Sequence, residues 1–160
     1  MTAANTAAFF AAFLAMEWVA FFAHKYVMHG FLWFFHRDHH TRDNAGFFER
    51  NDFFFVLFAT PGITLIYLGA FSSPPDPRLG LGLGIAAYGL CYVLVHDLFI
   101  HQRLKTPKGL GVRYGAAIRR AHRLHHRHLG KEDGECFGML WVPLSVWRQM
   151  RRTPIERPVP

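Results

Sequence analysis

Charged residues are absent from three long apolar segments of the chain. The first 16 residues carry none, and neither do residues 53–71 or residues 79–95. A helix needs about 20 mostly apolar residues to cross a hydrocarbon core about 30 Å thick. The pattern therefore predicts an all-α integral membrane protein with three spans, near residues 6–26, 53–71 and 79–99. The alternative is a water-soluble bundle of buried helices.

A fourth apolar stretch, residues 137–147, is too short to span a bilayer and is expected to lie at its interface. The first apolar segment has neither a basic stretch before it nor a small-residue cleavage site, so we do not expect a removable signal peptide. With 160 residues the chain has room for one domain, residues 1–160. Its histidine-rich region runs from about residue 17 to 143.

The basic residues predict the orientation of the spans. Arg78 lies in the short loop between the second and third spans, whereas the other 17 of the 18 Lys and Arg lie at residues 25–50 or 103–157. Three spans place those two regions on one side, and cytoplasmic loops gather Lys and Arg, so that side is expected to be the cytoplasm. Because these charges flank apolar spans, they suit anionic lipid headgroups, and no nucleic-acid partner is expected.

Histidine is the most informative residue type in this chain. Ten of the 11 histidines follow one pattern, H-x4-H and then H-x2-H-H, which occurs twice. His128 falls outside it and is expected to be a surface residue. The patterned histidines form four clusters: His24 and His29; His36, His39 and His40; His96 and His101; and His122, His125 and His126.

Helical spacing predicts how these side chains point. Positions three and four apart share a face, so His36, His39 and His40 point one way, as do the last three. The offset of five residues spreads His24 and His29 by about 140° around an α-helix, so that each would reach a different metal. If the first helix runs on to about residue 35 and the third through His101, all four clusters meet on one side of the membrane.

Ten imidazoles exceed the four to six ligands of one transition metal, so two ions with about five nitrogens each are expected. Imidazole suits iron, zinc, copper and nickel. A closed structural zinc site would use four ligands, typically with cysteine, so this site is interpreted as catalytic. The alternatives are polar anchors, a proton relay, or a non-enzymatic membrane metal carrier. A carrier would need a series of acidic residues along the spans to pass an ion across, whereas the predicted spans contain only Glu17 and Asp97, which counts against a carrier.

Several other residues are candidates for supporting roles. Glu17 is ionisable and lies within a span; it could orient a ligand, line the substrate path or bond a neighbouring helix. Asp97 and Asp38 could hold imidazole N–H groups, each on another segment's histidine. Glu49 and Asp52 are expected to cap the second span. The phenylalanines near the histidines could line a tunnel for a long apolar substrate or face lipid.

Four stretches of the chain resemble a known family. HKYVMHG (24–30), HRDHH (36–40), YVLVHDLFIHQR (92–103) and AHRLHH (121–126) are similar to the bacterial β-carotene 3-hydroxylases, in the fatty acid hydroxylase and sterol desaturase superfamily. The resemblance extends from about Glu17 to Pro143 and includes FERND, LIYLG and FGMLWVP. The family usually has glycine after the His-Asp pair of the third box, where this chain has Leu98, which alters local packing.

The resemblance implies a function and its cofactors. The ten patterned histidines would bind two iron ions, with zinc an alternative in a purified sample. O2 and electrons from a ferredoxin-type donor would convert β-carotene through β-cryptoxanthin to zeaxanthin. The protein would lie in the bacterial inner membrane, where lipid and carotenoids are its partners. A carotenoid ketolase, or a hydroxylase or desaturase of acyl lipids, is the alternative on the same scaffold.

Overall fold

The computed structural model describes residues 1–41, 46–72, 76–104 and 113–152. Every regular element in these ranges is a helix, as the sequence predicts. The elements are α1 (Ala3–Phe22), the π-helix η1 (Ala23–Phe31), α2 (Trp33–Thr41), α3 (Asp52–Ala70), α4 (Pro77–Tyr92), the π-helix η2 (Val93–Ile100), α5 (Arg113–His125) and α6 (Leu144–Arg152).

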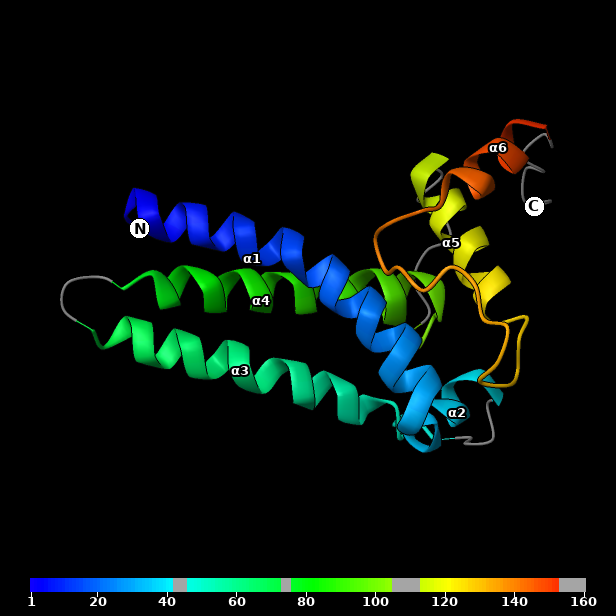
Figure 1. The fold of residues 1–160 in the computed structure, drawn as a ribbon, viewed down its shortest axis with the longest axis horizontal. Coiled ribbons are helices and arrows are strands. Elements are labelled where there is room, and N and C mark those ends of the chain that lie inside the picture. The colour runs from blue at the N-terminus through cyan, green and yellow to red at the C-terminus, as the bar shows by residue number, and fades with distance from the viewer. Residues whose placement is uncertain (42–45, 73–75, 105–112, 153–160) are drawn as a thin grey trace.

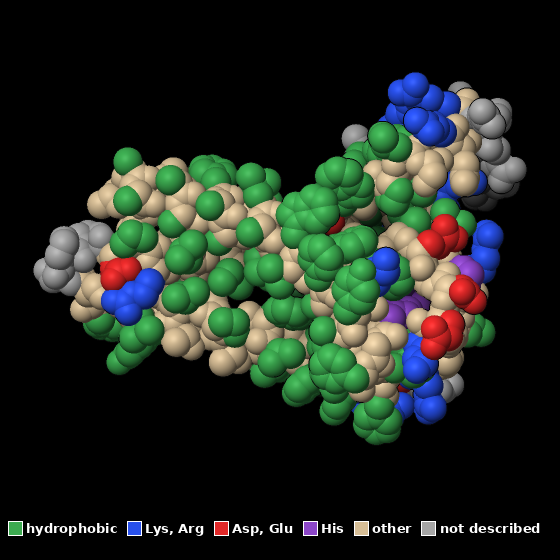
Figure 2. Space-filling model, in the orientation of Figure 1, with side chains coloured by type: hydrophobic (Ala, Val, Ile, Leu, Met, Phe, Trp, Pro, Cys, Tyr) green, Lys and Arg blue, Asp and Glu red, His purple; other side chains and the backbone are tan. Residues whose placement is uncertain are grey.

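Within the described residues, three helices are long and apolar enough to cross a membrane, which confirms the three predicted spans. They comprise Ala3–Phe31, Asp52–Ala70 and Pro77–Ile100. In Figure 1 they lie side by side, with the N-terminus and the end of α3 at one end and α2, α5 and α6 at the other. Hydrophobic side chains cover the visible face of the spans, whereas histidines and most charged groups gather near α2, α5 and α6 (Figure 2). This distribution suits a protein that has lipid around its middle.

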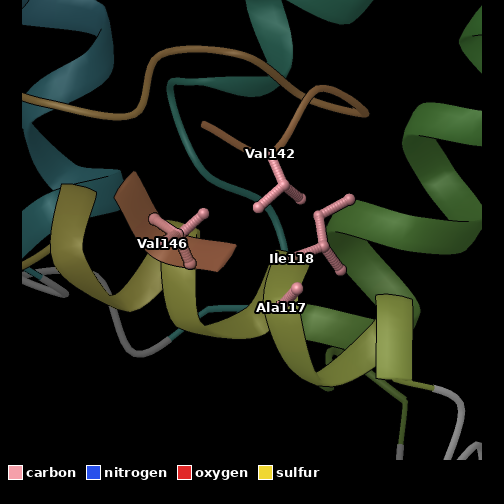
Figure 3. Close-up of a cluster of buried hydrophobic side chains, with 5 residues drawn as sticks. Ala117, Ile118, Val142 and Val146 are labelled. Carbon is pink, nitrogen blue, oxygen red and sulfur yellow. The ribbon is translucent and has the colours of Figure 1, made fainter. Parts of the chain in front are cut away.

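The stretch 137–147 is not a fourth span. Residues 137–143 form no regular element, and α6 follows them. We call residues 128–143 the strap, because this segment returns from α5 to the first span. Its Trp141 ring lies 5.9 Å from the ring of Trp18 in α1. Ala117 and Ile118 of α5 pack with Val142 of the strap and Val146 of α6, which fixes the strap to both helices (Figure 3).

Glycines let α4 approach both neighbouring spans closely. A Cβ added to Gly80 would collide with the backbone carbonyl of Asn5 in α1, and one added to Gly84 would collide with that of Phe9. On the other side, a Cβ at Gly82 would lie 2.6 Å from the amide nitrogen of Ile66 in α3. Small residues spaced in this way are typical of helix packing in membranes, where close backbone contact replaces the hydrophobic driving force.

The first helix ends earlier than the sequence predicts. Gly30 has φ −106° and ψ −123°, which are not helical values, and the chain turns there before α2. The prediction of one continuous helix to about residue 35 is therefore wrong. Because of this turn, α2 does not extend the axis of the first span (Figure 1).

We expect Gly80→Ala to lower the free energy of unfolding by about 1–3 kcal/mol, because the added methyl group must push α1 away from α4. Gly89→Ala is a matched control on the same helix, since no atom lies within 4 Å of the added Cβ. That change should leave stability equal or raise it by about 0.5–1 kcal/mol. Thermal unfolding in detergent measures both, and equal effects would contradict the close α1–α4 contact.

Candidate metal centre

The ten patterned histidines converge at one end of the bundle. Nitrogens of nine of them fall into two sets whose atoms all lie within 4.8 Å of one another, and each set could hold a metal ion. The first histidine group is His24, His29, His36, His40 and His125; the second is His39, His96, His101 and His122. The tenth, His126, has its ring centroid 4.4 Å from those of His40 and His122, so it lies between the groups.

The two π-helices explain the H-x4-H spacing. In a π-helix the N–H of residue i+5 bonds to the carbonyl of residue i, so residues five apart lie on adjacent turns of one face. The His101 amide donates to the His96 carbonyl at 2.9 Å in this way. His24 and His29 likewise belong to one group, so the prediction that they reach different metals is wrong, because it assumed α-helical geometry.

The two H-x2-H-H clusters bridge the groups. His36 and His40 belong to the first group, but His39, on the same short helix, belongs to the second. In α5 His125 joins the first group and His122 the second. Three histidines on one helix face thus point toward one region, as predicted, yet contribute to two neighbouring sites.

The imidazole nitrogens that face inward fit metal ions. The Nε2 atoms of His24 and His36 are 3.1 Å apart, those of His36 and His40 3.2 Å, and those of His101 and His122 2.7 Å. Two nitrogens bound at right angles to one ion, at about 2.1 Å each, would be about 3 Å apart. In the described part of the chain, four more Nε2 atoms are buried without a hydrogen-bond partner, those of His29, His39, His125 and His126.

The outward nitrogens of the first histidine group donate mainly to the strap. Their Nδ1–H groups reach backbone carbonyl oxygens, from His24 to Phe137 at 3.0 Å and from His125 to Glu135 at 2.9 Å. His29 donates to the carbonyl of Lys131 at 3.2 Å, and His40 to that of His128 at 2.9 Å. The fifth, His36, donates to the side-chain oxygen of Asn51 at 2.7 Å. With Nδ1 protonated, Nε2 is left free to bind a metal.

Carboxylates support the second histidine group instead. His39 donates its Nδ1–H to Glu49 at 2.7 Å, and His96 donates to Asp97 at 2.7 Å. Arg103 joins these acids, since its guanidinium donates to Glu49 at 3.1 Å and to Asp52 at 2.8 Å and lies 3.8 Å from Asp97. Burial raises the pKa of Glu49, which Arg103 opposes.

Four of the patterned histidines outside the spans are held in their neutral form, namely His39, His40, His122 and His125. Burial is the largest cause, and it lowers the pKa of His40 to about 4 and that of His125 to about 3, with neighbouring histidines adding to the effect. Burial also lowers the pKa of His39 and of His122 well below the ordinary value. Neutral imidazole is the form that binds metals, so the site is prepared for ions at pH 7.

Glu17 fastens the strap to the first span. Its carboxylate accepts the backbone N–H groups of Met139 at 3.0 Å, Leu140 at 2.9 Å and Trp141 at 2.8 Å, as well as the O–H of Tyr88 at 2.8 Å. Among the alternatives from the sequence, bonding to a neighbouring helix is therefore confirmed, through Tyr88 of α4. The hydrogen bonds between Glu17 and the strap could not be predicted from the spacing of residues in the sequence.

The supporting acids differ in part from those expected. Among the described residues Asp97 accepts from the adjacent His96, at 2.7 Å, and not from another segment's histidine. Among the described residues Asp38 accepts from the backbone and side chain of Arg50 and from no histidine. Glu49 serves His39 and not the helix start, where Asp52 accepts the Glu49 N–H at 3.0 Å. Asn51 and Arg103 were not singled out in the sequence.

An apolar cavity of about 420 Å³ adjoins the histidines. Residues of α1, α3 and α4 line it within the membrane part of the bundle, including Phe54, Phe55 and Phe58. His24 and His36 of the first histidine group and His96 and His122 of the second also line it. Part of the phenylalanine-rich region therefore faces a cavity, as the tunnel interpretation requires, whereas Phe31, Phe34 and Phe48 are exposed.

Comparison with known proteins identifies the family. The fatty acid hydroxylase family matches residues 9–151. This chain belongs to the fatty acid hydroxylase family. A protein of Pantoea ananas called beta-carotene hydroxylase is 42% identical over 139 residues, which make up 87% of this chain and 78% of that protein. Another beta-carotene hydroxylase, of Pseudescherichia vulneris, is 41% identical over 129 residues, or 81% of this chain and 72% of that protein.

A plant relative extends the same similarity. Beta-carotene hydroxylase 1, chloroplastic, of Capsicum annuum is 37% identical over 139 residues, which cover 86% of this chain but 43% of the longer plant protein. No solved structure matches this chain. For a member of a hydroxylase family, the paired histidine groups beside an apolar cavity form a candidate active site.

We expect Glu17→Ala to release the strap from α1, because it removes the acceptor of several hydrogen bonds and such bonds to charged groups contribute about 1.5–3 kcal/mol each. Trypsin should then cut at Lys131 at least about tenfold faster, since cleavage of a native protein tracks the opening of its local structure. Glu135→Ala is the control, because this exposed strap carboxylate lies 3.9 Å from the His128 ring, away from both α1 and the bond that trypsin cuts. Equal cleavage rates for the two variants would contradict the fastening role.

Proposed function

We propose that this protein is a β-carotene hydroxylase that adds a hydroxyl group at carbon 3 of each β-ionone ring, from β-carotene through β-cryptoxanthin to zeaxanthin. The observation that carries the proposal is the apolar cavity of about 420 Å³ that meets histidines of both groups. The names of the bacterial and plant relatives support the choice of substrate.

The ten patterned histidines are proposed to hold two iron ions, with His126 completing the second histidine group. The inward Nε2 atoms and the orphaned buried nitrogens support this assignment. When bound, the iron pair supplies the activation of O2. In the net reaction a ring C–H and O2 take up two electrons and two protons to give the alcohol and water. A ferredoxin-type protein is proposed as the electron donor.

The protein's own side chains position the substrate. Phe54 and Phe58 of α3 and Ile85 of α4 surround an apolar end ring, and the cavity volume admits an end of a C40 carotene while the remainder extends along the lipid. Closure of the site by the strap residues Phe137 and Met139, which also line the cavity, limits the access of water to the reacting ring. Positioning and water exclusion are thus the contribution of this chain.

We propose further that the histidine end of the bundle faces the cytoplasm of a bacterial inner membrane, because nearly all Lys and Arg flank that end. A reporter that is active only in the cytoplasm should be active when fused after Leu104 and inactive when fused after Ser72. The reverse pattern would place the active site outside and would exclude a cytoplasmic electron donor.

In bacteria that make β-carotene, expression of this chain should yield β-cryptoxanthin first and zeaxanthin later, and neither without O2. The order follows because the two rings are equivalent and only one end fits the cavity at a time. Pigment chromatography is the measurement. Ketones at carbon 4 as the main product would indicate a ketolase, and unchanged β-carotene with altered acyl chains a lipid hydroxylase.

Variants in the same assay test the metal ligands. His39→Ala and His125→Ala, one from each histidine group, should abolish product or reduce it by a factor on the order of 100, because each removes a buried ligand. His128→Ala should keep activity, since this residue contributes only its backbone carbonyl to His40. Full activity in both ligand variants would contradict the metal assignment.

A further inference from the structure

The two histidine groups differ in the groups that lie behind them. In the first histidine group every Nδ1–H that bonds outward meets a neutral oxygen, from the backbone of the strap or from Asn51. In the second, His39 and His96 each meet a carboxylate at 2.7 Å. In both groups the nitrogens that face the metal sites belong to imidazole rings. The groups therefore differ in the atoms that accept the outer Nδ1–H hydrogen bonds.

The acceptor of the outer N–H affects how strongly the inner nitrogen binds a metal ion. A carboxylate that accepts the outer N–H draws its proton and makes the inner nitrogen a stronger electron donor, which strengthens the bond to a cation. A backbone carbonyl fixes the ring in the same orientation but carries no net charge. In the second histidine group the acceptors therefore fix the ring orientation and also carry negative charge.

The charges near the second histidine group add to this effect. Glu49, Asp52 and Asp97 surround Arg103, so one guanidinium faces three carboxylates and the network stays negative. The Arg103 side chain is only 13% exposed, so water screens these charges incompletely. The acids of the strap near the first group, Glu132, Asp133 and Glu135, are exposed to solvent.

The number of ligands does not cancel this difference in charge between the two histidine groups. The first group has five histidines and the second four, but the ring of His126 lies 4.4 Å from His122, 4.8 Å from His39 and 4.9 Å from His101. Its buried Nε2 has no hydrogen-bond partner among the described residues. The His126 ring also lies 4.4 Å from that of His40 in the first group. With His126 assigned to the second group as proposed, each group offers five imidazoles, and the outer acceptors remain as the distinguishing feature.

We infer that the metal centre is built unequally, so that the second histidine group, supported by Glu49 and Asp97, binds its ion more tightly than the first and fills first. This inference rests on the proposed metal centre. Glu49 and Asp97 are positioning residues that act through His39 and His96. The stronger donors of this group also favour the more oxidised ion, so the two ions differ in how readily they give up an electron.

Sequential loading of the whole protein tests the inference without any variant. Metal-free protein in detergent, kept without O2, receives first one and then a second equivalent of ⁵⁷Fe²⁺. Mössbauer spectra should show one quadrupole doublet after the first equivalent and a second, different doublet after the next. Removal with a ferrous chelator should proceed in two steps of one ion each. Both doublets growing together from the first addition would overturn the inference.

Variants then assign the steps to the groups. Glu49→Gln and Asp97→Asn keep the size of the side chain but remove its charge, and each should weaken the tighter step by about 10–100-fold while leaving the looser step in place. Asn51→Asp is the reciprocal change, since it puts a carboxylate behind His36 and should strengthen the looser step. Glu132→Gln, on the exposed strap, should change neither.

Two failures can be told apart in these measurements. Loading that stops below two ions per chain would contradict the proposed metal centre itself. Loading that reaches two ions in a single step would contradict unequal binding but not the metal centre itself. The same conclusion would follow if Glu49→Gln weakened only the looser binding step.

Discussion

Lone pairs on neutral nitrogens repel one another, and this repulsion is the constraint on which the rest of the structure depends. The fold brings the Nε2 atoms of His24 and His36 to 3.1 Å, and each ring donates its outer Nδ1–H to an oxygen, so no proton lies between the two inner nitrogens. A cation bound between these nitrogens would remove the repulsion. The turn at Gly30, the two π-helices and the strap all serve to keep ten imidazoles in that arrangement.

The sequence predicted the parts of the fold that depend on local composition. Three uncharged segments predicted three spans, and this topology predicted that the four histidine clusters lie on one side of the membrane. What it did not predict depends on departures from regular backbone. The chain turns at Gly30, and π-helical turns put His24 beside His29, whereas an α-helix would separate them. Nothing in the composition of residues 23–31 distinguishes these backbones.

The supporting residues were harder to predict, because they depend on tertiary contacts. Asn51 and Glu49 read as ordinary residues of a helix start, and Arg103 as one of many flanking cations, yet all three contact the histidines or the acids behind them. Four of the acceptors are backbone carbonyls of the strap, which any sequence could supply. Glu17 was recognised as unusual because it is charged within a span, but only the fold shows that it binds backbone amides of the strap.

The strap has a consequence for the order in which the protein is made. The carbonyl that orients His24 lies 113 residues later in the chain, and the last amide held by Glu17 lies 124 residues later. Synthesis proceeds from the N-terminus, so the first three histidine clusters leave the ribosome before the segment that fixes the first group exists. Spans can insert one by one, but the active site cannot assemble along with them. The first histidine group can therefore reach the geometry that suits a metal ion only after the strap has been translated and has docked on the spans.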